Sequence, residues 1–439
     1  MAGDAHRTTV GDYVTLVRGT TYKGQLVGEP GPALLGLGSI EPGGGFRIGH
    51  YKTYGGDCPE ELMLFPGDIF ASLKGATKDG KMIGSVARVP PSVPSGRLTQ
   101  DTVKLVFRNP NLEDASYLYW ILRTPQYRDY CAGHAMGSAV VALSRRDFLS
   151  YPVPPPTTQR RTVVALLDAI EKKVELNRRM NETLEAMARA LFKSWFVDFD
   201  PVRAKVEGRD PDLPKPLAAL FPETFEDSEL GEIPKGWSAT PIYDVATYIN
   251  GAAYAAFQPN DERRGLPIIK IAELKAGATA QTKFSDVQMA EKYRVTNGDI
   301  LLSWSGNPDT SIDTFVWSDG PGWLNQHIFR VSPLRQDERA FVLSTLKTLR
   351  PVFAEIARNK QTTGLGHVTT EDMKRLLIAR PDDRVMLVWS TVASPLHGRS
   401  FQNALENHDL SKLRDTLLPK LIFGELKVKD AEKFIRRAV

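Results

Sequence analysis

A narrow apolar stripe runs along residues 157–200 of the chain. From Leu167 onward its positions alternate in steps of three and four, and charged residues fill many of the positions between them. The stripe consists of Leu167, Ile170, Val174, Asn177, Asn181, Leu184, Ala188, Leu191 and Trp195. This spacing predicts a long helix that pairs with one other helix rather than with a surrounding core. Thr157 or Thr158, which follow a run of prolines, can cap its first free amides.

The chain also matches itself at an offset slightly above half its length. Residues 11–22 match 243–254, residues 67–72 match 298–303, and residues 143–156 match 368–381. The sharpest match aligns Asn177, Asn181, Leu184 and Leu191 with Asn403, Asn407, Leu410 and Leu417. Because all the matches occur in the same order, they predict a tandem duplication of a globular domain followed by a long helix.

The two globular segments have mixed patterns. Residues 62–73 and 297–304 have the pattern of a turn followed by a strand, whereas residues 117–122 and 341–352 have helical spacing. We expect an α+β fold in which two similar mixed α/β domains are separated by two long antiparallel helices, a coiled-coil spacer with a pseudo-two-fold internal repeat. The expected segments are a first domain at 1–156, a helix at 157–200, a linker at 201–237, a second domain at 238–382, a helix at 383–426 and a tail at 427–439.

Polar residues interrupt the apolar stripe of the expected helix pair. An amide buried there without a partner would cost about 1 to 3 kcal/mol. In an antiparallel pair, Asn403 and Asn407 could serve as partners for Asn177 and Asn181, and the four amides would then fix the register. The alternative is that these asparagines lie at the solvated edge of the stripe.

Prolines modify this picture in two places. Pro395 and Gly398 fall inside the second expected helix and predict a kink or break there. Between the first helix and the second domain, prolines recur among charged residues over 201–237, which predicts a stiff linker lying over the surface.

Composition limits the class of protein. With 439 residues, 42% apolar and 25% charged, and with no run of 18 apolar residues, the chain reads as a folded protein of two or three domains. Cys58 and Cys131 are too few and too far apart to indicate a disulfide framework. We therefore expect a soluble, cytoplasmic protein. The net charge of +4 permits a nucleic-acid partner without requiring one.

Catalytic motifs are weak. The segment 75–82 nearly matches a phosphate-binding loop, but Met82 stands where that loop needs a hydroxyl for magnesium, so a hairpin turn is the better interpretation. The seven histidines lack the spacing of metal ligands. Neither a metal site nor a catalytic set emerges, although an unfamiliar enzyme, such as a nuclease that uses this loop, stays open.

Several motifs in combination resemble those of a known family. They are Pro154-Pro155-Pro156 followed by Gln159-Arg160-Arg161, and the runs at 191–201, 230–237 and 413–421. With these motifs the chain resembles the specificity subunit of a type I restriction-modification enzyme over nearly its whole length. Its departures are Pro395 with Gly398 and the tail from Lys427 to Val439.

The resemblance implies two target-recognition domains that each read one half of a split DNA sequence, with the helices acting as a ruler. It implies that the chain is not an enzyme and holds no metal or cofactor itself. Its implied partners are double-stranded DNA, two methylation subunits that use S-adenosylmethionine to methylate adenine, and restriction subunits that use ATP and Mg. The bases that are read do not follow from the resemblance.

If DNA is the ligand, loops at the strand ends must offer donors to phosphates and base edges. The candidates in the first domain are Thr20, Thr21, Tyr22, Lys23, Ser72, Lys74, Thr77, Lys78, Ser138, Ser144, Arg145 and Arg146. Those in the second domain are Asn250, Tyr254, Ser303, Trp304, Ser305, Asn307, Lys360, Thr362, Thr363 and His367.

Each candidate also has an ordinary structural interpretation. Ser72 and Ser303 can satisfy local backbone groups, and Trp304 can belong to the core. The main rival function is a structural adaptor whose domains bind protein rather than DNA. Binding to DNA through phosphates would weaken steeply with salt, which separates the two hypotheses.

Overall fold

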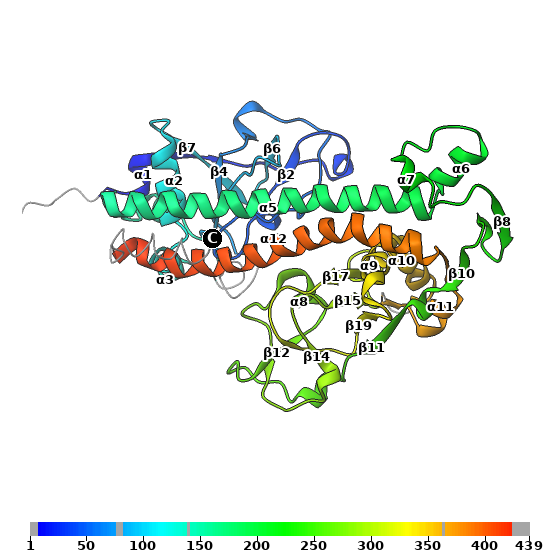
Figure 1. The fold of residues 1–439 in the computed structure, drawn as a ribbon. Coiled ribbons are helices and arrows are strands. Elements are labelled where there is room, and N and C mark those ends of the chain that lie inside the picture. Colours follow the sequence, from blue (N-terminus) through cyan, green and yellow to red (C-terminus); the bar gives the residue numbers. More distant parts are fainter. Residues whose placement is uncertain (1–7, 76–81, 138–140, 362–364, 424–439) are drawn as a thin grey trace, which may run out of the picture. The chain divides into compact units, whose positions relative to one another are not determined.

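The computed structural model describes residues 8–75, 82–137, 141–361 and 365–423, with backbone only at 421–423 (Figure 1). The chain divides into two compact units, one formed by Met1–Glu175 with Asp409–Val439 and the other by Leu176–His408. Each unit contains one mixed domain and parts of two long helices, α5 (Thr158–Phe196) and α12 (Asp383–Phe423). The expected fold class is confirmed.

The domain of the first unit is built on two small sheets. The larger sheet has the order β1-β7-β4-β5 and is antiparallel, and the smaller has the order β2-β6-β3. Their strands are β1 (Val14–Arg18), β2 (Ala33–Leu35), β3 (Met63–Leu64), β4 (Ile69–Ser72), β5 (Val86–Arg88), β6 (Gly96–Leu98) and β7 (Thr102–Phe107). The helices are α1 (Val10–Tyr13), α2 (Leu112–Ile121), α3 (Pro125–His134) and α4 (Arg145–Ser150).

The domain of the second unit repeats this plan. Its sheets have the orders β11-β19-β15-β17 and β13-β12-β18-β14. The strands are β11 (Ala246–Asn250), β12 (Leu266–Ile269), β13 (Phe284–Ser285), β14 (Arg294–Val295), β15 (Ile300–Ser303), β17 (Asp313–Val316), β18 (Gly322–Leu324) and β19 (Ile328–Pro333), with the short pairs β16 (Ser305–Gly306) with β20 (Gly366–His367) and β10 (Ser238–Pro241) with β21 (Leu377–Arg380). The helices are α8 (Ile271–Ala276), α9 (Arg339–Thr348), α10 (Arg350–Asn359) and α11 (Thr370–Arg375). The predicted duplication is therefore confirmed.

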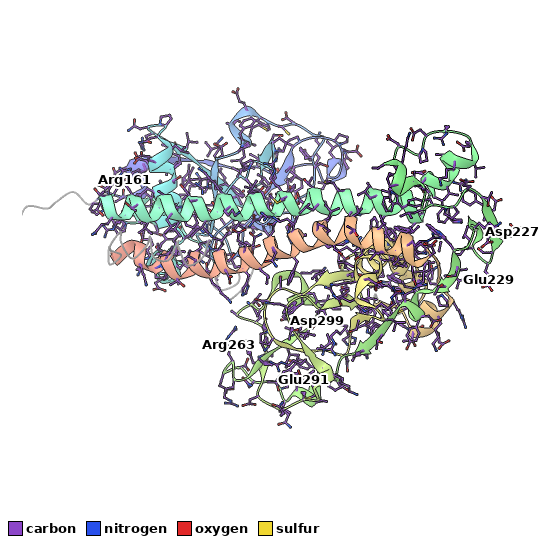
Figure 2. All side chains as sticks on the ribbon, viewed as in Figure 1. Arg161, Asp227, Glu229, Arg263, Glu291 and Asp299 are labelled. Carbon is purple, nitrogen blue, oxygen red and sulfur yellow. The ribbon has the colours of Figure 1, made fainter. Side chains whose placement is uncertain are left out.

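The matched turns before β4 and β15 show why the repeat survives in the sequence. Gly67 and Gly298 have φ angles of 96° and 95°, a region that favours glycine. The following aspartates close both turns in the same way: the Asp68 carboxylate accepts from the Phe65 amide at 2.9 Å, and that of Asp299 accepts from the Thr296 amide at 2.7 Å. Asp299 is labelled in Figure 2. Both turns thus need the same Gly-Asp pair.

Helix α5 begins as the sequence predicts. The hydroxyl of Thr157 accepts from the Arg160 amide at 3.3 Å and caps the first turn. Within the first unit, Leu167 and Ile170 of α5 share one buried cluster with Leu410 of α12. In each unit the stripe of α5 therefore covers α12, and the two helices lie side by side (Figure 1).

The four asparagines meet across the helix pair within the second unit. Asn177 Nδ2 donates to Asn407 Oδ1 at 3.0 Å, and Asn403 Nδ2 donates to Asn181 Oδ1 at 2.8 Å. Asn177 Nδ2 also donates to Glu406 Oε2 at 2.7 Å. Partners run in opposite directions along the two helices, so the pairing is antiparallel. Asn177 and Asn403 are fully buried, which overturns the solvated-edge interpretation for these two residues.

The expected break in the second helix is wrong. Helix α12 runs without interruption from Asp383 to Phe423. Pro395 and Gly398 are exposed, whereas Trp389 and Asn403 on either side are buried. A proline in a helix removes one backbone hydrogen bond, and here its cost is outweighed by the packing of the neighbouring turns.

The expected linker is also wrong, because residues 201–237 fold. They form α6 (Asp200–Val206), α7 (Lys215–Ala218) and a hairpin of β8 (Phe225–Ser228) and β9 (Gly231–Pro234). Val202, Phe221 and Trp237 are buried in one cluster with Trp195 and Phe196 of α5. The apolar residues between the prolines thus complete a hydrophobic core. The spacing of the prolines does not indicate this core.

A network of charged and aromatic groups attaches the first domain to α5. Arg88 Nη2 lies 2.8 Å from Asp168 Oδ1, and Arg88 also pairs with Glu171. Arg123 Nη1 donates to Glu171 Oε1 at 3.1 Å, and Trp120 Nε1 donates to Asp168 Oδ1 at 2.8 Å. Burial by itself would raise the pKa of both carboxyl groups, but the guanidiniums and the hydrogen bonds outweigh burial and lower the pKa of Asp168 and Glu171.

An aromatic cluster attaches the second domain to both helices. Trp389 of α12 is fully buried, and its ring centroid lies 5.5 Å from that of Phe192, 5.6 Å from Trp195 and 5.1 Å from Phe196, all on α5. Phe341 of α9 joins the cluster at 5.7 Å from Phe192. Contacts of this kind add to the free energy of apolar burial.

A histidine lies beside this cluster. His397 Nε2 is 3.0 Å from Ser344 Oγ of α9, and the Lys347 ammonium pairs with Glu185 at 2.6 Å nearby. Burial, followed by the charge of Lys347, lowers the pKa of His397 to about 4. The ring is therefore neutral at pH 7.

Candidate nucleic-acid interface

The ends of β1 and β11 form the same close contact in the two domains. A Cβ atom on Gly19 would lie 1.9 Å from the carbonyl oxygen of Thr99, and one on Gly251 would lie 2.2 Å from that of Asn325. Only glycine fits such an approach. It holds the turn that joins β6 to β7, and its counterpart between β18 and β19, directly against the end of the first strand of each domain.

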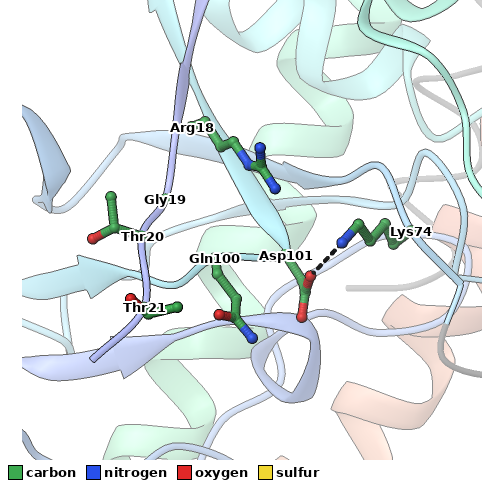
Figure 3. Close-up of a pocket in the computed structure, with 7 residues that line it drawn as sticks. All are labelled: Arg18, Gly19, Thr20, Thr21, Lys74, Gln100 and Asp101. Atoms are coloured by element: carbon green, nitrogen blue, oxygen red, sulfur yellow. Dashed lines mark hydrogen bonds and ion pairs between the residues drawn. The ribbon is translucent and has the colours of Figure 1, made fainter. Parts of the chain in front are cut away.

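A cleft of the first domain opens beside this contact (Figure 3). It is lined by Arg18, Gly19, Thr20, Thr21, Lys74, Gln100 and Asp101. Lys74 Nζ lies 3.0 Å from Asp101 Oδ1 across it. The cleft thus combines two cations and one carboxylate with amide and hydroxyl groups. Cations, amides and hydroxyls are the donor types that contact phosphates and base edges.

Buried Arg97 positions the predicted residues Thr20 and Thr21. Arg97 Nη2 donates to Thr20 Oγ1 and to the Thr21 carbonyl, both at 3.0 Å, and its Nε donates to the Asp57 carbonyl at 2.9 Å. Thr20 and Thr21 are exposed, so this segment is fixed at its base and open at its surface. No motif or spacing in the sequence indicates this role of Arg97.

Among the other predicted residues of the first domain, some are exposed and one is buried. Tyr22 and Lys23 are exposed next to the cleft-lining threonines. Ser72 is fully buried and its hydroxyl donates to the Lys74 carbonyl at 2.6 Å, which bears out its structural interpretation.

A third predicted segment begins α4. Ser144 caps this helix, because its hydroxyl accepts from the Asp147 amide at 3.0 Å. Arg145 and Arg146 are exposed on the first turn. Thr77, Lys78 and Ser138 lie outside the described residues.

In the second domain the structure brings four predicted residues together. Trp304 Nε1 donates to Asn250 Oδ1 at 3.0 Å, and the Trp304 carbonyl accepts from the Val368 amide at 2.9 Å. Ser305 pairs with His367 between β16 and β20. Ser303 is buried, like Ser72. Its hydroxyl donates to the carbonyl oxygens of Ser311 and Asp313.

Three further residues of the second domain have local partners. Tyr254 lies under the Lys270 ammonium at 5.4 Å, and the Asn307 side chain accepts from the Thr310 amide at 3.1 Å. Lys360 forms an ion pair with Asp372 at 2.5 Å, and Asp372 also belongs to the cap of α11. Thr362 and Thr363 fall outside the part of the chain that the structure describes.

Sequence reasoning missed the turns that carry Gln100 with Asp101 and Gln326 with His327. Bridges at Thr20–Thr99 and Ala252–Asn325 show that the turns are equivalent. Between β4 and β7 the second copy is shorter, so the offset falls from 231 for β4 and β15 to 226 for β7 and β19. At the smaller offset, Gln100 aligns with Gln326.

Two negative findings apply to the described residues. Within them, no group of three or more histidine, cysteine, aspartate or glutamate side chains is placed to hold a metal ion. No helix in the described ranges is long and apolar enough to cross a membrane.

Comparison with known proteins agrees with this geometry. Residues 234–384 match the family model of the type I restriction modification DNA specificity domain. The chain is 24% identical over 325 residues to the type I restriction enzyme MjaIX specificity subunit of Methanocaldococcus jannaschii, covering 72% of this chain and 70% of that protein. It is 23% identical over 366 residues to the HindI specificity subunit of Haemophilus influenzae, covering 72% and 79%.

A solved structure shares the fold. The type I restriction-modification S subunit from M. genitalium aligns over 94% of both chains with a TM-score of 0.54 and 14% sequence identity. The family model covers the second mixed domain, the matches to the two relatives extend well beyond it, and the solved structure has the same architecture. Taken with the motifs at residues 154–161 and 191–201, these matches confirm that the chain resembles the specificity subunits of type I restriction-modification enzymes.

Proposed function

We propose that this chain is the DNA-recognition subunit of a type I restriction-modification complex. Its two domains each read one half of a split target, and its paired helices bind the methylation subunits. The observation that carries the proposal is the duplicated domain, whose two copies present polar turns at equivalent positions. Cations such as Arg18 and Lys74 would contact phosphates, and amide groups would contact base edges.

The chemistry belongs to the partners in this proposal. Methylation subunits with S-adenosylmethionine would modify adenine, and restriction subunits with ATP and Mg would cut DNA. The role of this chain is to select the sequence, and its polar turns bind and orient the duplex. The proposed set of contacts retains the exposed candidates and excludes buried Ser72 and Ser303.

The function is tested by mapping methylated adenines in DNA from cells that express this chain with its methylation subunits. We expect one split motif with a fixed gap. Binding of a duplex that contains the motif should weaken steeply between about 50 and 200 mM salt, because phosphate contacts release counterions. An affinity for DNA that changes neither with salt concentration nor with the DNA sequence would instead support the function of a protein adaptor.

The modest net charge of +4 predicts that this chain alone binds DNA weakly. Titration of a labelled target with the lone chain and with the assembled complex should give clearly tighter binding for the complex. Equal affinities would contradict the idea that the methylation subunits complete the interface.

A second prediction concerns the helix pair as a ruler. Four residues inserted into α5, with a matching insertion in α12, add about 6 Å of helix. At about 3.4 Å per base pair, the gap in the methylated motif should grow by one or two pairs. An unchanged gap in a folded, active variant would remove the ruler from the proposal.

A further inference from the structure

The turns that follow β6 and β18 occupy equivalent places in the repeat. The residues before them, Thr99 and Asn325, form parallel bridges to Thr20 and Ala252 at the ends of β1 and β11. The strands that follow, β7 and β19, have the same burial pattern residue by residue. Whatever one turn presents to a ligand, the other presents from the same position in its own domain.

Both turns are held rigidly from behind. The contact of Gly19 with Thr99, like that of Gly251 with Asn325, leaves no room for a side chain between the turn and the strand. In the first domain, the Thr102 hydroxyl also donates to the Thr99 carbonyl at 2.9 Å. A side chain that extends from such a turn needs little further ordering when it binds, which favours affinity and selectivity.

The first side chain of each turn is a glutamine with hydrogen-bonding capacity to spare. Gln100 is exposed in the cleft of Figure 3, and no group among the described residues hydrogen-bonds to its amide. Gln326 is half-buried; its Nε2 lies 3.2 Å from His327 Nε2, and within the described chain its carbonyl oxygen has no partner. Each amide therefore has an acceptor and at least one donor hydrogen that no described group uses.

The neighbours of the two glutamines differ. In the first domain Asp101 holds Lys74 across the cleft, whereas the corresponding positions of the second domain carry His327 and Ser305. The amide is therefore the chemistry that the two turns share. The residues beside the glutamine differ between the two turns.

We propose that Gln100 and Gln326 are equivalent specificity-determining residues, each reading one adenine in the half-site of its own domain. In the major groove adenine offers N7 as an acceptor and the N6 amino group as a donor, the pattern that a glutamine amide matches with two hydrogen bonds. The Gln Nε2 donates to N7, and the Gln Oε1 accepts from N6. This inference rests on the proposed DNA recognition and adds the residues and the base to it.

The test uses the full chain assembled with its methylation subunits and a duplex that carries its mapped motif. Each adenine is replaced in turn by 7-deazaadenine, which lacks the N7 acceptor. For wild type we expect one adenine per half-site at which the replacement weakens binding by about 5- to 150-fold. In Gln100→Glu the donor to N7 is lost, so replacement at the first-domain adenine should add little further loss.

Gln326→Glu should behave in the same way at the adenine of the other half-site and leave the first unchanged. Gln288→Ala, which changes an exposed glutamine in another loop of the second domain, is the matched control and should keep the wild-type response at every adenine. Thermal unfolding of each variant checks that it is folded.

Two results would count against the inference in different ways. If every 7-deazaadenine duplex loses the same affinity with Gln100→Glu and Gln326→Glu as with wild type, the glutamines do not read adenine N7 and the inference is overturned, while the proposed function stands. If the wild-type complex prefers no duplex sequence over another, the proposed function itself fails.

Discussion

The two mixed domains share one fold but are attached to the long helices by different chemistry. The first adds an ionic network, with Arg88 and Arg123 placed against Asp168 and Glu171, to its apolar contact with α5. The second depends on aromatic rings around Trp389. A duplicated domain thus keeps its topology while its support diverges. The difference predicts that mutation and acid will weaken the two attachments unequally.

The largest effect is expected from Trp389→Ala, which leaves a cavity among the rings of α5. Removing a fully buried tryptophan should cost about 3 to 5 kcal/mol of the free energy of unfolding. Chemical denaturation followed by far-UV circular dichroism measures this cost. Leu387→Ala, at a residue of the same helix that is 57% exposed, is the control and should change stability far less. Equal losses for both variants would mean that the cluster does not support the second domain.

The next effect concerns acid and the second unit. His397 is neutral in the fold because its pKa is lowered to about 4 by burial and by Lys347, with Arg339 acting in the same direction and Glu185 opposing. In the unfolded chain this histidine takes up a proton near pH 6.5. Its contribution to the free energy of unfolding is therefore fully present above that pH and is lost as the pH falls from about 6.5 to about 4. The loss is on the order of 3 kcal/mol.

Pulsed hydrogen exchange at one fixed labelling pH, after incubation at each test pH, reports this loss separately for peptides of the two units. His397→Gln should flatten the decline in the second unit. A decline that is unaltered in this variant would assign it to other groups.

A somewhat smaller effect is expected from Arg88→Met. The substitution leaves Asp168 and Glu171 with less compensating charge, at a cost of about 2 to 3 kcal/mol. Because the pKa of both carboxyl groups is lowered in the fold, their stabilisation is present above their ordinary pKa and is lost as the pH falls below about 4.5.

Protection of the first unit should therefore be lost at lower pH than that of the second, and the loss should be weaker in Arg88→Met. Arg145→Met, at an exposed arginine of the same domain, controls for the removal of one positive charge. If both arginine variants lose the same stability, the network around Arg88 contributes nothing specific.

The smallest effect is expected at the N-terminal end of α5, where Arg161 is labelled in Figure 2. Arg161 Nη1 lies 2.9 Å from Glu113 Oε2; the Glu113 side chain is largely exposed and that of Arg161 is partly exposed. Arg161→Ala should therefore cost less than about 1 kcal/mol. A loss as large as that of Arg88→Met would show that ionic attachment does not depend on burial.

Much of the fold could be predicted from the sequence because its signals are regular. The stripe from Leu167 to Trp195 repeats over several turns, and the pairing of Asn177 with Asn407 follows from the constant offset of the helices. The strands β1 and β11 keep the same burial pattern, so their match was also visible. These elements can be predicted because their pattern repeats along the chain.

Other features depend on contacts that spacing does not show. The prolines of residues 201–237 resemble those of an extended linker, but Phe221 and Trp237 find a core that only the folded chain supplies. Pro395 is tolerated because buried residues flank it in space. The match of Gln100 with Gln326 is hidden because a shortened segment shifts the offset. The position of Ser72 does not reveal that its hydroxyl donates to the Lys74 carbonyl. Contacts of the candidate residues with DNA remain a proposal.

The shared glycine contact has a consequence for engineering. Gly19 and Gly251 each allow a turn to lie directly against the strand beside it, in the same register. The backbones of the two turns are therefore held in equivalent ways. Residues 100–101 could be transplanted into positions 326–327 without disturbing the backbone that carries them. The chain thus keeps the backbone of the turn and its glutamine in both domains, whereas the next residue differs, aspartate at 101 and histidine at 327.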